Sequence, residues 1–180
     1  MRVGLLALQG AFAAHARPLA ELGHATFEAR TPEEIAEADG LVLPGGESSV
    51  HLALIERLRL RDALLAFGAS GRPVLAVCAG LILAAREVSS PEQASLALLD
   101  VAVVRNAYGR QRQSFVSTSD DGALELVFIR APRLARVGPE VCVLATHRRE
   151  PVLVRQGNVT GAAFHPELTT SLAVHRAAFE

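Results

Sequence analysis

PVLAVCAGLILAAR, residues Pro73–Arg86, joins a strand-like pattern to a helix-like pattern and carries a cysteine at the junction. The run PVLAV is short, apolar and preceded by a turn, which predicts a buried strand. The following AGLILAARE predicts a helix over 79–87. Cys78 is therefore expected at the carboxyl end of a strand, directly before a helix.

The same alternation of strand and helix fills the first half of the chain. Strands that alternate with helices imply right-handed crossovers and a parallel sheet that is covered on both faces. Expected strands are Arg2–Leu8, Ala25–Ala29, Gly40–Pro44 and Pro73–Val77; expected helices are 13–23, 33–38, 79–87 and one from Ser49 with Leu54, Ile55, Leu58 and Leu65 on its inner face.

The second half is richer in strands, some of which we expect to form a small antiparallel extension. Expected strands are 100–104, 112–118, 124–130, 141–145, 151–156 and 159–164, followed by a helix over 171–180. The whole predicts one three-layer α/β domain over residues 1–180, with a mostly parallel central sheet and helices on both faces. Ligands of such sheets bind at the carboxyl ends of the strands.

Composition narrows the class of protein. The 180 residues are 50% hydrophobic and 21% charged, with a net charge of −1, which is typical of a globular protein. This balance argues against nucleic acid or an anionic membrane as the main partner, and the apolar runs are too short to span a membrane. The two cysteines form no CxxC or Cys/His pattern, so we expect no metal site and a reduced, cytoplasmic location.

The setting of Cys78 favours a reactive thiol. A residue on a sharp strand-to-helix turn projects over the sheet edge, and the small Ala79 and Gly80 suit a cramped turn. The helix N-terminus favours thiolate over thiol. The alternative is an inert core cysteine, and the local pattern alone leaves both open. Cys142 lies in an alternating strand, where a thiol is expected to act as a small hydrophobic side chain.

Two further strand ends supply complementary groups. In AAFHPEL, extended backbone would place His165 and Glu167 on the same side, so that the carboxylate fixes the tautomer of the imidazole. In LPGGESS, a glycine pair lets the backbone approach a ligand, and the Gly46 N–H with that of Ala79 would form an oxyanion hole. The other histidines, which are interpreted as surface or structural residues, are His15, His24, His51, His147 and His175.

Together, VCAGLILAA, LPGGESS and FHPELT resemble the class I glutamine amidotransferases, which have a Cys-His-Glu triad and a flavodoxin-like fold. This resemblance implies Cys78, His165 and Glu167 as the triad and L-glutamine as the substrate. LALQG near the start, RNAYGRQRQSF (Arg105–Phe115) and VFIRAP (Val127–Pro132) narrow the resemblance to the glutaminase subunits of pyridoxal 5'-phosphate synthase, the PdxT/SNO family.

The narrower resemblance covers Val3 to about His175. It implies no cofactor, because pyridoxal 5'-phosphate would be the product of a partner synthase subunit that accepts the ammonia. Gln9, Gly10 and Gly45 become candidates for sensing that partner. The positions that match the family's glutamine-binding residues are Gly46, Glu47, Ser48, Arg105, Ile129 and Arg130.

Two other functions fit part of this pattern. Related intracellular cysteine hydrolases and chaperones share the elbow, but they typically place histidine after the cysteine and glutamate after the first strand. This chain has Ala79 and Gln9 at those positions. A non-enzymatic docking module is the second rival, and the complete set of triad residues argues against it.

Overall fold

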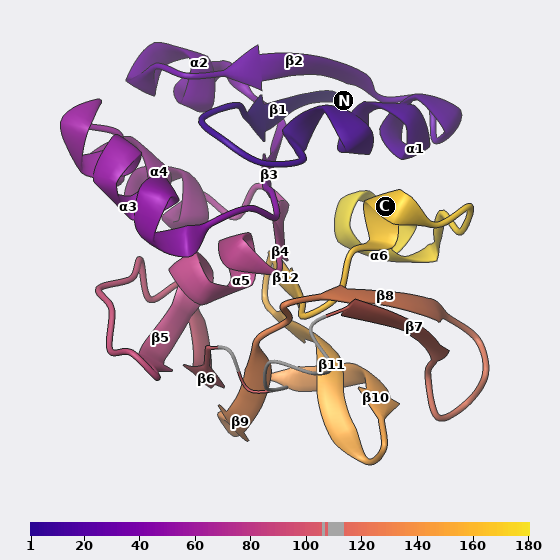
Figure 1. The fold of residues 1–180 in the computed structure, drawn as a ribbon. Coiled ribbons are helices and arrows are strands. Elements are labelled where there is room, and N and C mark those ends of the chain that lie inside the picture. The colour runs from indigo at the N-terminus through magenta and orange to yellow at the C-terminus, as the bar shows by residue number, and fades with distance from the viewer. Residues whose placement is uncertain (106, 108–113) are drawn as a thin grey trace.

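A seven-stranded sheet, in the order β10-β11-β12-β4-β3-β1-β2, forms the centre of the computed structural model, which describes residues 1–105, 107 and 114–180 (Figure 1). The five strands from β12 to β2 are parallel, whereas β10 and β11 are antiparallel additions at one edge. This confirms the predicted sheet and its extension. Its strands are β1 (Arg2–Leu6), β2 (Ala25–Ala29), β3 (Gly40–Leu43), β4 (Val74–Val77), β10 (Cys142–His147), β11 (Glu150–Gln156) and β12 (Val159–Ala162).

Helices cover both faces of the sheet, as predicted. In Figure 1, α3, α4 and α5 lie on one side of the central strands, and α1 and α6 lie on the other. The central strands β3, β4 and β12 are buried along their whole length, which explains the continuous apolar sequences of β3 and β4. The helices are η1 (Phe12–His15), α1 (Ala16–Glu21), α2 (Pro32–Glu37), α3 (Ser48–Arg57), α4 (Arg61–Ala69), α5 (Ala79–Ala84), η2 (Pro166–Leu168) and α6 (Ala173–Phe179).

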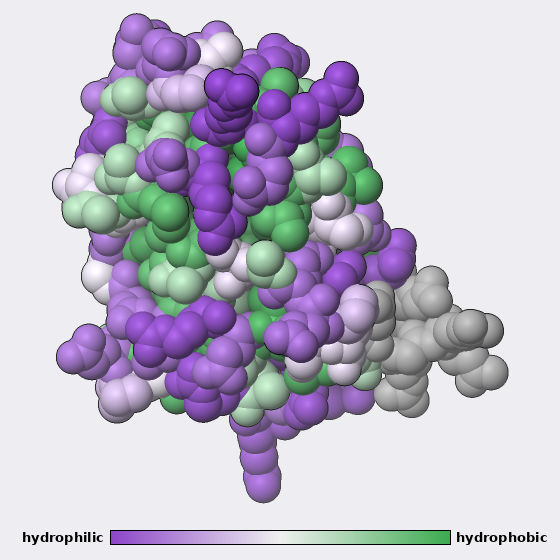
Figure 2. All heavy atoms as spheres, turned by 90° about the vertical axis from the view of Figure 1, so that its left-hand side faces the viewer, coloured by the Kyte–Doolittle hydropathy of each residue, from purple (hydrophilic) through white to green (hydrophobic). Residues whose placement is uncertain are grey.

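The helix predicted from Ser49 is two helices. α3 and α4 are separated by a turn in which Arg59 adopts a positive φ of 55° and Leu60 is buried. Because the turn changes the direction of the chain, Leu58 is 43% exposed rather than on the inner face. Figure 2 views this side of the molecule, where hydrophilic side chains interrupt the apolar ones.

The helix predicted over 79–87 is shorter than expected. It ends at Ala84, and Ala85–Ser89 forms β5, which pairs with β6 (Leu99–Val104). β6 also pairs with β9 (Arg133–Val137), a strand that was not predicted. Pairing with distant strands here outweighs the helix propensity of alanine, arginine and glutamate.

A two-stranded ribbon completes the fold. β7 (Ser114–Thr118) pairs with β8 (Glu125–Ile129), and residues 112 and 113 of the predicted strand 112–118 lie outside the described residues. Phe128 on β8 is buried and packs edge-to-face on Phe164, just before His165. The ribbon is thereby fixed beside the carboxyl edge of the sheet. Within the described part of the chain, no helix is long and apolar enough to cross a membrane.

Candidate active site

Cys78 occupies a strained elbow between β4 and α5. Its φ of 49° and ψ of −99° lie outside the regions favoured by residues with a Cβ. The Cys78 N–H donates to Ala162 O at 2.8 Å, and the Gly80 N–H donates to Pro44 O at 3.1 Å. A Cβ on Gly80 would lie 2.0 Å from the carbonyl oxygen of Leu43, so the close approach of α5 to β3 requires glycine.

The imidazole of His165 and the carboxylate of Glu167 form a buried pair. His165 Nδ1 lies 2.7 Å from Glu167 Oε1, and the two side chains are 8% and 0% exposed. The contact does not arise from extended backbone, as the sequence suggested, because Pro166–Leu168 forms the 3-10 helix η2. Proline begins this turn, since its fixed φ suits the first helical position. The His165 N–H donates to Val127 O at 2.8 Å, which ties the site to β8.

The electrostatics favour a charged His165. Burial lowers the pKa of His165, but its interactions with Cys78 and Glu167 outweigh burial and raise that pKa to about 10. Burial raises the pKa of Glu167, but the bond to His165 and the nearby His15 imidazole more than compensate, so that pKa is lowered. The imidazole is therefore protonated and the carboxylate ionised at neutral pH, an arrangement suited to stabilising a thiolate.

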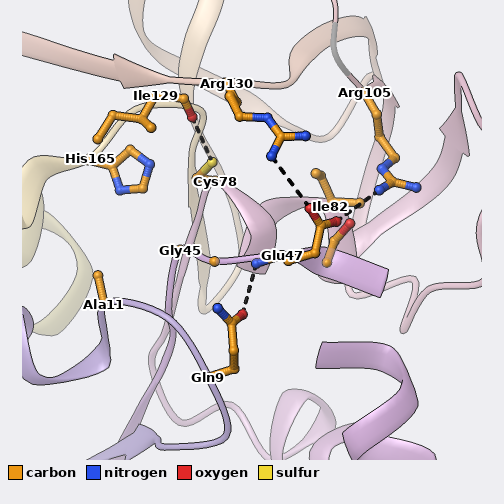
Figure 3. A pocket seen from close by; sticks show the side chains of 12 residues that line it. Gln9, Ala11, Gly45, Glu47, Cys78, Ile82, Arg105, Ile129, Arg130 and His165 are labelled. Atoms are coloured by element: carbon orange, nitrogen blue, oxygen red, sulfur yellow. Dashed lines mark hydrogen bonds and ion pairs between the residues drawn. The ribbon is translucent and has the colours of Figure 1, made fainter. Parts of the chain in front are cut away.

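A cavity of about 360 Å³ opens above these groups (Figure 3). Cys78 is only 5% exposed, and its Sγ lies 3.8 Å from Ile129 O. The cavity brings together ten of the predicted site residues, which come from separate parts of the sequence. Its lining residues are Gln9, Ala11, Gly45, Gly46, Glu47, Ser48, Cys78, Ile82, Arg105, Ile129, Arg130 and His165.

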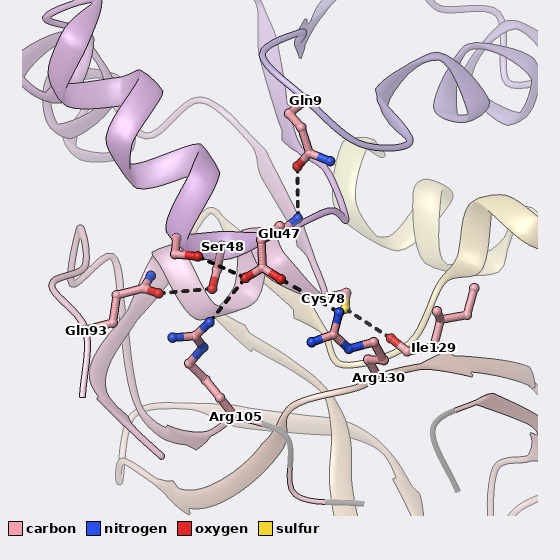
Figure 4. A network of polar contacts seen from close by, with 9 residues as sticks. Gln9, Glu47, Ser48, Cys78, Gln93, Arg105, Ile129 and Arg130 are labelled. Carbon is pink, nitrogen blue, oxygen red and sulfur yellow. Dashed lines mark hydrogen bonds and ion pairs between the residues drawn. The ribbon is translucent and has the colours of Figure 1, made fainter. Parts of the chain in front are cut away.

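Glu47 is the centre of a polar network on one wall of the cavity (Figure 4). Its Oε1 lies 3.2 Å from Arg105 Nη2 and its Oε2 lies 3.8 Å from Arg130 Nη1. Ser48 Oγ donates to Gln93 Oε1 at 3.1 Å. A carboxylate beside two guanidinium groups offers partners for both charges of a free amino acid, an ammonium and a carboxylate.

The glycine turn after β3 is fixed by the loop after β1. The Ala11 N–H donates to Gly45 O at 3.1 Å, and the Glu47 N–H donates to Gln9 Oε1 at 2.9 Å. Gly10, which has a φ of 86°, lies so close that an added Cβ would be 2.0 Å from the Gly45 oxygen. A Cβ on Gly45 would lie 2.5 Å from the Cε1 atom of His165. The candidate sensing residues therefore contact the turn that borders the cavity.

Some outcomes differ from the sequence interpretation. Ala79 is the first residue of α5 and does not line the cavity, and its N–H as an oxyanion donor stays a prediction. Cys142 is exposed on β10, so it does not pack as a core hydrophobic side chain. Gln93 was missed, because only the folded loop after β5 brings it to Ser48. His15 and His175 were also missed as neighbours of the site, although each is buried.

The chain is similar to a known family, to curated relatives and to solved structures. The model of the SNO glutamine amidotransferase family matches residues 5–179. A pyridoxal 5'-phosphate synthase subunit PdxT from Shouchella clausii is 45% identical, covering 98% of this chain and 93% of the relative. The PdxT of Koribacter versatilis is 46% identical, covering 97% and 92%. A solved glutamine amidotransferase superposes with a TM-score of 0.90 at 40% identity, covering 97% and 95%.

Proposed function

The chain belongs to the SNO glutamine amidotransferase family, and we propose that it hydrolyses L-glutamine to L-glutamate and ammonia for pyridoxal 5'-phosphate synthesis. The observation that carries this proposal is the meeting of Cys78, at its strained elbow, with His165 in one cavity, backed by the 2.7 Å contact between His165 and Glu167. Because the nucleophile must stay reduced, the proposal places the chain in the cytoplasm.

Hydrolysis proceeds in two stages. The Cys78 thiolate attacks the side-chain amide carbon, and the N–H groups of Gly46 and Ala79 hold the oxyanion. As the C–N bond breaks, the His165 imidazolium gives its proton to the nitrogen, which leaves as ammonia. His165 then takes a proton from water, whose oxygen attacks the thioester carbon. The C–S bond breaks, and glutamate leaves with the thiolate restored. Glu167 orients His165 through both stages.

Substrate binding would use the polar wall formed by Glu47, Arg105 and Arg130 in the same cavity as the thiol. Glu47 suits the α-ammonium of glutamine, and the fork of an arginine, Arg105 or Arg130, suits its α-carboxylate. This assignment rests on the ion pairs at 3.2 and 3.8 Å, in which the charge of Glu47 faces those of Arg105 and Arg130. Ser48 and the backbone of Ile129 border the same space and complete the proposed binding set.

The proposal includes a partner that receives the ammonia. Free ammonia is protonated in neutral water and lost as a nucleophile, so it should pass directly to a synthase subunit of the kind that the relatives' names imply. Docking at Gln9 and Gly10 would act on the Gly45–Gly46 peptide, since Ala11 N–H holds the Gly45 oxygen. We expect weak hydrolysis by the chain alone, strong stimulation by the partner, and tighter docking in the presence of glutamine.

The direct test is steady-state release of ammonia from glutamine, with and without a PdxS-type synthase subunit. Cys78→Ser should abolish release while retaining the fold, because a hydroxyl stays protonated where a thiol ionises. Cys142→Ser is the matched control and should retain full activity, since that thiol is exposed on β10. Wild-type activity in Cys78→Ser would show that Cys78 is not the nucleophile. Identical kinetics of the free and the docked chain would refute stimulation by the partner but would leave the role of Cys78 intact.

A further inference from the structure

Two buried histidines lie behind the His165–Glu167 pair. His15 ends η1 and His175 lies in α6, and both residues are 0% exposed. His15 Nδ1 lies 2.9 Å from His175 Nε2, within hydrogen-bond distance. The mechanism proposed above uses neither ring. Most buried polar atoms in proteins have a hydrogen-bond partner, so the second nitrogen of His15, which has none among the described residues, needs an explanation.

Glu167 faces the second nitrogen of His15. His15 Nε2 lies 3.8 Å from Glu167 Oε2, on the side of the carboxylate away from His165. Among the described residues, neither of these two atoms has a hydrogen-bond partner, and both are buried. A donor nitrogen and an acceptor oxygen therefore face each other unpaired. A movement of about 1 Å would bring them to hydrogen-bond distance.

The protonation of the pair follows from burial. Burial lowers the pKa of His15 to about 4 and that of His175 to about 3, so each ring is neutral at pH 7 and carries one proton. The neighbouring charges are Glu167, His165 and Arg17, whose Nη2 donates to Thr169 O at 2.7 Å. If His15 carried its proton on Nδ1, a lone pair would face the Glu167 carboxylate. A proton on Nε2 faces the carboxylate favourably and leaves Nδ1 free to accept from His175.

We infer that His15 is a positioning residue for the glutamine hydrolysis proposed above: its Nε2–H holds the outer oxygen of Glu167, and His175 fixes the tautomer that makes this possible. The carboxylate then has a donor on each oxygen, His165 on Oε1 and His15 on Oε2. A carboxylate held from both sides cannot rotate away when His165 gives up and regains its proton. The alignment of His165 with Cys78 is thereby kept through both stages.

Two substitutions at the same position separate this role from packing. In His15→Gln, the amide nitrogen reaches the place of Nε2 and can still donate to Glu167. In His15→Asn, the shorter amide reaches only the place of Nδ1, which keeps the contact with His175 and loses the donor to Glu167. With the synthase subunit present, His15→Asn should lower kcat about tenfold at unchanged KM, and His15→Gln should stay within about twofold of wild type.

A second measurement does not depend on turnover. In a Cys142→Ser background, the rate of Cys78 alkylation by iodoacetamide at neutral pH reports its thiolate, which His165 stabilises. His15→Asn should slow alkylation several-fold, and His15→Gln should not. His147→Asn is the matched control: His147 is also buried, but its Nδ1 lies 3.0 Å from Thr118 O and it does not contact the triad. This control should leave both rates unchanged.

Equal kcat and alkylation in His15→Asn and wild type would overturn the inference, as would an equal loss in both His15 variants. If His15→Asn does not fold, the comparison moves to His175, where Leu should slow alkylation and Gln, which keeps a donor to His15, should not. Equal alkylation in those two variants would likewise overturn it. Wild-type protein that releases no ammonia would refute the proposed function instead, and the alkylation series would still decide the role of His15.

Discussion

The elbow predicts that glycine at position 78 is tolerated better than at an ordinary buried site. Cys78 has a φ of 49° and a ψ of −99°, and holding a residue with a Cβ in such a region costs about 1–3 kcal/mol. Cys78→Ala keeps this strain, whereas Cys78→Gly removes it. Removing the strain should raise the free energy of unfolding by about 2 kcal/mol. The greater freedom of glycine in the unfolded chain lowers it by about 0.7 kcal/mol, and the lost methyl group lowers it by about 0.8 kcal/mol. The net is a gain of about 0.5 kcal/mol for Gly over Ala.

Thermal and urea unfolding of the two variants measure this difference. In a chain of this size, 0.5 kcal/mol corresponds to a rise of about 1–2 °C in Tm. Ala76→Gly is the matched control, because Ala76 is fully buried in β4 and has no positive φ. It lacks the strain gain and should lose about 1.5 kcal/mol. If Cys78→Gly were less stable than Cys78→Ala by that same amount, the elbow would carry no strain and the reasoning would be refuted.

Two further predictions concern the residues around the thiol. His165→Asn should lower kcat more than about 10³-fold, because it removes the proposed acid and base. Glu167→Gln should lower kcat about 10²-fold, since substrate binding and the oxyanion donors remain. Ammonia release measures both losses, and equal losses would contradict the proposed roles. Because the pKa of His165 is raised to about 10, kcat/KM should hold above neutral pH and fall as pH rises through about 10, where the imidazolium is lost. A basic limb near pH 6.5 in the pH profile would exclude the charged pair.

The parallel half of the fold could be predicted because a local sequence pattern indicates each of its strands and helices. β3 and β4 are short apolar runs bounded by turn residues, and α2 begins at Thr31-Pro32 with a capping box in which Thr31 and Glu34 satisfy each other's backbone N–H groups. β5 and β9 could not be predicted in the same way. Their residues form strands because β6 lies between them in space, which is a tertiary effect.

The candidate site likewise contains residues that the local sequence indicates and residues that only the folded chain brings together. Cys78, His165 and the glycine turn follow predicted strands, so the sequence itself places them at the carboxyl edge of the sheet. His15 and Gln93 have no such local sign. His15 reaches Glu167 only because η1, η2 and α6 meet, and Gln93 reaches Ser48 only through the loop after β5. Contacts between residues this far apart in sequence leave no periodicity to read.

The pairing of β4 with β12 determines when the elbow around Cys78 can form during synthesis of the chain. Ala162 accepts from the Cys78 N–H at 2.8 Å, so the elbow is completed by a strand that leaves the ribosome more than eighty residues after the cysteine. Before that pairing forms, Cys78 lacks both the elbow and the neighbouring His165, and we expect it to react like the thiol of an unfolded chain. We therefore expect the reactivity of this thiol to appear only after β12 has paired with β4.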